Sequence, residues 1–115
     1  MAPRVSRGEI WYASLNPTKG HEQAGYRPVL ILSADMFNHG PASLVIVVPL
    51  TTRERGIPTH IPIAPPESGL PQRSFVLCEA IRSITKDRLG DRPLGSVSAQ
   101  TLRHVEDTIR ILLDM

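Results

Sequence analysis

The sequence predicts a mainly β fold with a C-terminal helix, in which a small, strongly curved antiparallel sheet or barrel packs against that helix. Two observations lead to this class. Apolar β-forming residues come in short runs separated by Gly, Pro and Asn, and near the C-terminus the hydrophobic period becomes helical. A chain of 115 residues can close one core, so we expect a single domain over residues 1–115.

The first two strands are expected at residues 9–15 and 27–33. The first run stops at the Asn-Pro pair of residues 16–17, and a polar stretch over residues 18–25 connects the two. Pro28 stands near the start of the second strand, where a missing N–H costs least. The pattern therefore predicts a pair of strands joined by a polar loop.

A continuous apolar run at residues 44–50 predicts a strand that is buried on both faces. Two more strands are expected at residues 59–63 and 75–84. The Pro-rich segment between them, residues 64–71, is expected to be a loop, as is the Asn-His-Gly-Pro segment at residues 38–41. The sequence thus predicts about five strands.

The C-terminal helix is predicted from spacings of three, four and three residues, which place Leu102, Val105, Ile109 and Leu112 on one face. Ser98 is the expected N-cap. We expect this apolar face to pack against the sheet.

Composition excludes several classes of protein. No apolar run approaches the length of a membrane span, and no apolar segment follows the first arginines as in a secretory signal. A single cysteine, Cys78, rules out an internal disulfide framework and suits a reducing compartment. We therefore expect a cytoplasmic protein.

The cationic side chains are mostly arginine. Thirteen Lys and Arg residues face eleven Asp and Glu residues, and the only lysines are Lys19 and Lys86. The guanidinium fork matches phosphate oxygens, so this bias suits a polyanion partner. Arginine-rich codon use in a genome rich in G·C would give the same bias, and composition leaves both explanations open.

The densest group of chemically useful side chains is the loop at residues 21–28. It offers the imidazole of His21, the carboxylate of Glu22, the amide of Gln23 and the guanidinium of Arg27 just before a strand. Gly25 allows a backbone turn that directs side chains to one target. The alternative is a solvated hairpin in which Glu22 and Arg27 only pair with each other.

A second candidate group follows the buried strand, where Thr51 and Thr52 precede Arg53. Successive strand residues point to opposite sides, so at most one threonine is expected to face a site. Threonines at a sheet edge can also reflect β propensity alone. A third candidate is residues 79–83, where polar side chains interrupt an apolar strand.

Other markers of chemistry are missing from the sequence. The four histidines lack metal-ligand spacing, so we expect no metal and no cofactor. His60 is interpreted as structural and His104 as solvated on the helix. Cys78, among apolar neighbours, is expected to be a buried, inert thiol.

Taken together, the motifs resemble MazF/PemK-type toxins over nearly the whole chain. The Glu-Gln-x-Gly-x-Arg-Pro core at residues 22–28 is specific, and its occurrence together with the downstream motifs argues against chance similarity. The matching segments are Gly8-Glu9-Ile10-Trp11, residues 20–30, Val48-Pro49-Leu50-Thr51-Thr52, Pro58-Thr59-His60 and Glu79-Ala80-Ile81-Arg82-Ser83-Ile84.

The resemblance implies an SH3-like barrel, a homodimer, and sequence-specific cleavage of single-stranded RNA such as mRNA. It also implies a cognate antitoxin whose acidic, disordered C-terminal tail covers the RNA groove. The family's catalytic arginine and threonine correspond to Arg27 and Thr51, and its implicated glutamate corresponds to Glu22. His21 departs from the serine expected there. The expected RNA contacts are His21, Gln23, Tyr26, Thr52, Arg53, Arg82 and Ser83.

Cleavage without a metal would use the 2′-OH of the RNA as nucleophile. Arg27 can place two donors on the developing phosphate charge, and Thr51 can donate one hydrogen bond. Arginine stays protonated in proteins and is a poor general base. Either Glu22 or His21 is therefore expected to activate the 2′-OH.

Two rival functions fit the same fold. A CcdB-like gyrase poison acts through a C-terminal tripeptide that contains tryptophan, but the only tryptophan here is Trp11. A non-catalytic RNA-binding barrel would stack bases on aromatic side chains. The sequence shows only five aromatic residues and no aromatic cluster.

Overall fold

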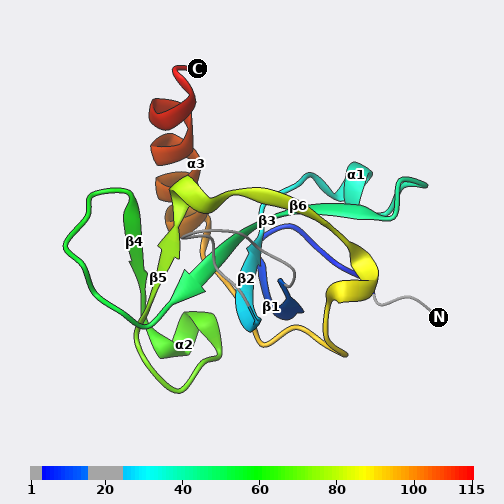
Figure 1. Ribbon diagram of the computed structural model, residues 1–115, viewed down its shortest axis with the longest axis horizontal. Coiled ribbons are helices and arrows are strands. Elements are labelled where there is room, and N and C mark those ends of the chain that lie inside the picture. Colours follow the sequence, from blue (N-terminus) through cyan, green and yellow to red (C-terminus); the bar gives the residue numbers. More distant parts are fainter. Residues whose placement is uncertain (1–3, 16–24) are drawn as a thin grey trace.

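The computed structural model describes residues 4–15 and 25–115, and it confirms a mainly β fold with a C-terminal helix (Figure 1). One antiparallel sheet of seven strands curls into a half-barrel in the order β4-β5-β3-β2-β1-β7, with β6 also paired to β3. The strands are β1 (Glu9–Ser14), β2 (Tyr26–Ile31), β3 (Leu44–Thr51), β4 (His60–Ile63), β5 (Ser74–Leu77), β6 (Arg82–Thr85) and β7 (Gly95–Ser96). The helices are α1 (Asp35–Asn38), α2 (Pro65–Ser68), α3 (Ala99–Leu113) and the 3-10 turns η1 (Cys78–Ala80) and η2 (Lys86–Arg88).

β3 is the organising strand, because it pairs with β2 along one edge and with both β5 and β6 along the other. Its alternate residues enter two separate apolar clusters. Val48 and Leu50 join a cluster that includes Val105 and Ile109 of α3, whereas Val45 and Val47 pack into the cluster on the other face. The prediction of a strand buried on both faces is confirmed, although Leu44 and Ile46 near its start are only half-buried.

The single strand predicted at residues 75–84 is wrong, because η1 divides it into β5 and β6. Val76 lies opposite Leu50 and Arg82 lies opposite Val47. Six residues therefore span the distance that three residues of β3 cover. The extra length is taken up in the three-residue turn, and the chain resumes pairing with the same strand at a new register.

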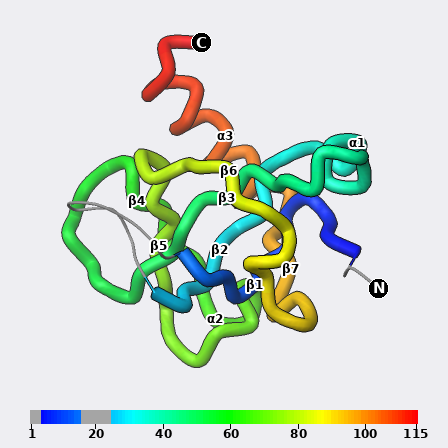
Figure 2. Tube along the Cα trace, turned by 45° about the vertical axis from the view of Figure 1, so that its right-hand side comes forward, coloured from blue at the N-terminus to red at the C-terminus, as the bar shows by residue number. Residues whose placement is uncertain are grey.

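Helix α3 begins as predicted, with the hydroxyl of Ser98 accepting a hydrogen bond from the Thr101 N–H at 3.1 Å. Its buried face ends at Ile109. The prediction that Leu112 also belongs to this face is wrong, since Leu112 is 42% exposed. Figures 1 and 2 show the reason: the last turns of the helix extend beyond the strands, where no layer remains to cover them.

The segment 64–71, expected to be a loop, contains the one-turn helix α2. Proline suits its first turn, where an N–H has no partner, and Gly69 ends it with a φ of 73°. A side chain at Gly69 would collide with the carbonyl of Leu94, so glycine lets this turn approach the segment before β7. The short elements α1, β7 and η2 were also not predicted, because they are too short to show a hydrophobic period.

Candidate functional site

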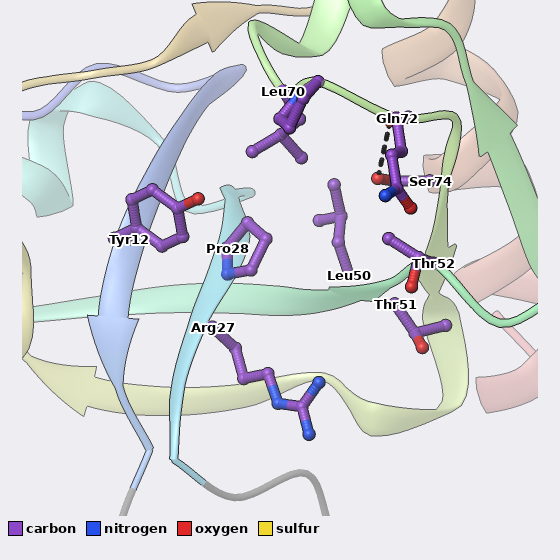
Figure 3. Close-up of a pocket in the computed structure, with 10 residues that line it drawn as sticks. Tyr12, Arg27, Pro28, Leu50, Thr51, Thr52, Leu70, Gln72 and Ser74 are labelled. Atoms are coloured by element: carbon purple, nitrogen blue, oxygen red, sulfur yellow. Dashed lines mark hydrogen bonds between the residues drawn. The ribbon is translucent and has the colours of Figure 1, made fainter.

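Arg27 and Thr51 lie on neighbouring strands at one edge of the sheet. β2 and β3 pair with Val29 opposite Pro49, and continuing this register by two residues sets Arg27 opposite Thr51. Figure 3 shows both side chains on the same side of the β3 ribbon. The structure therefore brings together the two residues that the sequence analysis selected from segments 24 positions apart.

Two cavities meet at this pair. One, of about 280 Å³, extends from Arg27 and Thr51 toward Tyr12 and Gln72. The other, of about 700 Å³, extends toward Arg53, Arg55 and the pair formed by His60 and Glu79. Arg27, Thr51 and Thr52 line both cavities. Three arginines around the larger cavity favour an anionic ligand.

The hydroxyl oxygen of Thr51 accepts a hydrogen bond from the Arg53 N–H at 3.2 Å, which closes a tight turn after β3. The hydroxyl hydrogen of Thr51 is then the part that can donate to a ligand. Thr52 is exposed and lines both cavities as well. The expectation that only one threonine faces a site is wrong, because β3 ends at Thr51 and strand alternation no longer applies to Thr52.

The loop that supplies the other candidate residues is only partly described. Glu22, His21 and Gln23 lie outside the described residues. The described flank agrees with the turn expected at Gly25, which has a φ of 82° and accepts a hydrogen bond from the Leu15 N–H at 2.9 Å. This bond joins the two ends of the loop beside Arg27.

An aromatic pair, which the sequence analysis did not foresee, lies on the neighbouring strands β1 and β2, and its Tyr12 also lines the smaller cavity. The rings of Tyr12 and Tyr26 stack with centroids 5.1 Å apart and planes 12° apart. Tyr26 is 62% exposed, and a side chain at Gly90 would meet its hydroxyl. The two tyrosines are 14 positions apart in sequence and meet only through the pairing of β1 with β2.

His60 and Glu79 are connected at the wall of the larger cavity. The imidazole Nε2 of His60 lies 2.6 Å from Glu79 Oε2, and the hydroxyl of Thr59 donates to Glu79 Oε1 at 2.7 Å. Burial opposes ionisation of Glu79, but the hydrogen bonds from Thr59, its own backbone N–H and His60 prevail, and the pKa of Glu79 lies below its usual value. The sequence analysis interpreted His60 as structural and did not predict this contact, because the two residues are 19 positions apart.

The remaining candidates fall in different places. Arg53 is exposed and lines the larger cavity, and its contact with RNA stays a prediction. Arg82 and Ser83 lie on β6, outside the residues that line either cavity. Arg82 donates from Nη1 to the carbonyl of Leu15 at 3.3 Å, which holds the end of β1. This contact gives Arg82 a structural role.

Cys78 is fully buried, and burial together with the nearby charge of Glu79 raises its pKa to about 12. An inert thiol was predicted, and this environment confirms it. His104 is exposed on α3, also as predicted. Within residues 4–15 and 25–115, no cluster of three or more His, Cys, Asp or Glu side chains is arranged to hold a metal ion. In the same part of the chain, no helix is both long and apolar enough to cross a membrane.

Two characterised relatives resemble this chain over almost its whole length. Endoribonuclease EndoA of Bacillus subtilis is 33% identical over 110 residues, which cover 95% of this chain and 94% of that protein. Endoribonuclease MazF of Staphylococcus saprophyticus is 34% identical over 112 residues, or 96% of this chain and 92% of that protein. Both alignments include the segments that carry Arg27 and Thr51.

Solved structures agree in fold. MazF from Deinococcus radiodurans superposes with a TM-score of 0.86 at 28% identity, covering 98% of this chain and 99% of that one. An endoribonuclease from a mycobacterial species, solved in complex with its cognate antitoxin, superposes with a TM-score of 0.78 at 29% identity and covers 96% of each chain. The family model of PemK-like, MazF-like toxins of type II toxin–antitoxin systems matches residues 6–113, and this chain belongs to that family.

Proposed function

We propose that this toxin is an endoribonuclease that cuts single-stranded RNA at specific sequences, without a metal ion. The observation that carries the proposal is the meeting of Arg27 and Thr51 at the junction of two cavities, one of them lined by three arginines. The two endoribonuclease relatives support the same activity. They do not favour a gyrase poison of the CcdB type.

The proposed reaction is an internal transfer. The 2′ oxygen bonds to phosphorus while the bond from phosphorus to the 5′ oxygen breaks, which leaves a 2′,3′-cyclic phosphate and a 5′-hydroxyl. The cyclic ester can then open to a 3′-phosphate. Arg27 stabilises the charge that develops on the phosphate oxygens with two parallel donors, and the Thr51 hydroxyl donates to one of those oxygens.

Two protons have to move in this scheme. The 2′-OH gives up its proton as it attacks, and we assign its removal to Glu22 or His21, the two candidates from the sequence. The departing 5′ oxygen gains a proton, and we assign its delivery to Arg27, which lies on β2 and lines both cavities. DNA lacks the 2′-OH and should resist cleavage.

The proposed partners follow from charge and size. An acidic, disordered antitoxin tail would compete with RNA for the arginine-lined cavity, and a related endoribonuclease was solved with its cognate antitoxin. We also propose a homodimer, because one small domain offers only a short groove and two copies extend it. Exposed apolar side chains at the end of α3, Ile111 and Leu113 among them, suit burial against a second copy. Cytoplasmic mRNA is the proposed target.

Digestion of a long RNA with sequencing of the fragment ends tests the proposal. We expect cuts at one recurring short sequence, 5′-hydroxyl ends, and cyclic or 3′-phosphates, with full activity in EDTA. A 5′-phosphate at the cut would show that water was the nucleophile and would refute this mechanism. Failure to cut any RNA would refute the function itself.

A further inference from the structure

The wall of the larger cavity holds a carboxylate in a defined position. Glu79 projects from η1, and the hydroxyl of Thr59 and the imidazole of His60 hold its two oxygens at 2.7 and 2.6 Å. The side chain of His60 is only 5% exposed, whereas that of Glu79 is 46% exposed. The buried histidine thus serves as a fixed support, and the carboxylate is the part that a ligand can reach.

This carboxylate is out of place in a site for phosphates. Among the described residues that line the larger cavity it is the one acidic side chain, and Arg27, Arg53 and Arg55 supply positive charge there. A phosphate placed against Glu79 would be repelled. Its useful contact in bound RNA is therefore with the N–H donors on the edge of a base, which single-stranded RNA leaves exposed.

The hydrogen bonds already made by Glu79 narrow the choice of base. An ionised carboxylate has about four lone-pair positions, two on each oxygen, and Thr59 and His60 occupy one on each. The backbone N–H of Glu79 also donates to this carboxylate, whose side chain is still 46% exposed, and two parallel N–H donors, one to each oxygen, match its planar shape. Guanine presents such a pair on its Watson–Crick edge, at N1 and N2. Adenine and cytosine place an acceptor beside their amino group, and uracil places its one N–H between two carbonyls.

We propose that Glu79 reads a guanine of the bound RNA through its N1–H and N2–H donors, with Thr59 and His60 as positioning residues. The inference rests on the proposed ribonuclease function and names a nucleobase that the site recognises. The free-energy cost of burying His60 with an unpaired nitrogen supports a role for this residue beyond packing. Nδ1 of His60 is buried and has no hydrogen-bond partner among the described residues, which destabilises the fold. A histidine at this position is therefore explained by its contact with Glu79 rather than by packing.

Glu79→Gln tests the proposal, because it keeps the size of the side chain and replaces one acceptor oxygen with a donor. The parent and the variant digest a library of RNAs with random sequence, and the ends are sequenced. We expect the parent to require guanine at one fixed position relative to the cut. The variant should lose that preference by about fivefold to 150-fold, the discrimination of one bidentate base contact, and keep its preferences at all other positions.

A matched control is Glu54→Gln, which makes the same change of charge near the same cavity. Glu54 pairs with Arg73 at 3.6 Å and does not line the cavity, so its variant should keep the parental preference at every position. His60→Leu should weaken the guanine preference without changing the others, and His60→Gln, which restores a donor, should recover part of it. A merely structural histidine would affect all positions equally.

An RNA with inosine at the selected position needs no variant, since inosine keeps N1–H and lacks the N2 amino group. Slower cleavage of this RNA by the parent is expected. Three outcomes would show that Glu79 does not read guanine although the ribonuclease function stands. These are a parent that cuts RNA without requiring guanine at any position, a Glu79→Gln variant that keeps the parental sequence preference, and a Glu79→Gln variant that stops cutting every sequence. A parent that cuts no RNA would remove both proposals.

Discussion

Replacing Arg27 with alanine should abolish most cleavage and leave the fold intact. Arg27 is the second residue of β2, and its side chain is exposed and lies outside both apolar clusters. Substitutions of exposed side chains usually change the free energy of unfolding by less than about 0.5 kcal/mol. Losing preorganised donors from a developing charge costs about 2.7–4 kcal/mol of transition-state stabilisation, which is about a hundredfold to a thousandfold in rate.

Arg27→Lys gives an intermediate case, since lysine keeps the positive charge and loses the planar fork. We expect its rate to lie between that of the parent and that of Arg27→Ala. The assay is single-turnover cleavage of one short RNA that contains the recurring cut sequence, with saturating protein. The melting temperature of each variant is measured in the same buffer, so that loss of activity and loss of structure are separated.

Val48→Ala is the matched control for stability. Val48 is fully buried within the apolar cluster that includes Val105 and Ile109 of α3, so removing two methyl groups should cost about 2–3 kcal/mol and lower the melting temperature on the order of 10 °C. Its cleavage rate below the melting transition should stay close to parental. If Arg27→Ala melts like the parent and still cuts at the parental rate, the site is wrong. If it loses activity only because it unfolds, Arg27 is structural.

Three further predictions concern the site and the fold. Thr51→Ala should slow cleavage less than Arg27→Ala, because a neutral hydrogen bond is weaker than a charge-assisted one, and the same single-turnover assay measures this. Cleavage should persist in excess EDTA, whereas a loss that magnesium or manganese restores would contradict the mechanism. Glu67→Gln should lower the melting temperature at pH 7. Burial raises the pKa of Glu67, but hydrogen bonds from Ser98 and Thr101 prevail and keep it below its usual value. The stabilisation by this carboxylate is therefore present above about pH 4.3 and is lost as the pH falls through its folded pKa, so the difference between parent and variant should shrink in acid.

Local sequence signals were sufficient for the elements that carry the site. The apolar run that forms β3, the strand entered through Pro28 and the helix capped by Ser98 all follow from hydrophobic period and end signals within a few residues. Arg27 and Thr51 could be selected because each belongs to a specific motif at a strand end. The roles of Glu22 and His21 remain predictions from sequence.

Features that depend on pairing between distant segments were decided only by the tertiary structure. The break between β5 and β6 exists because both pair with β3 at different registers. The exposure of Leu112 reflects where the sheet ends, which helical period does not show. The contact of His60 with Glu79 joins two elements whose separation in space no local pattern encodes. Hydrophobic periodicity and helix caps depend on residues that are close in the chain. The partner of a residue across the sheet depends instead on strand register, which the whole core determines.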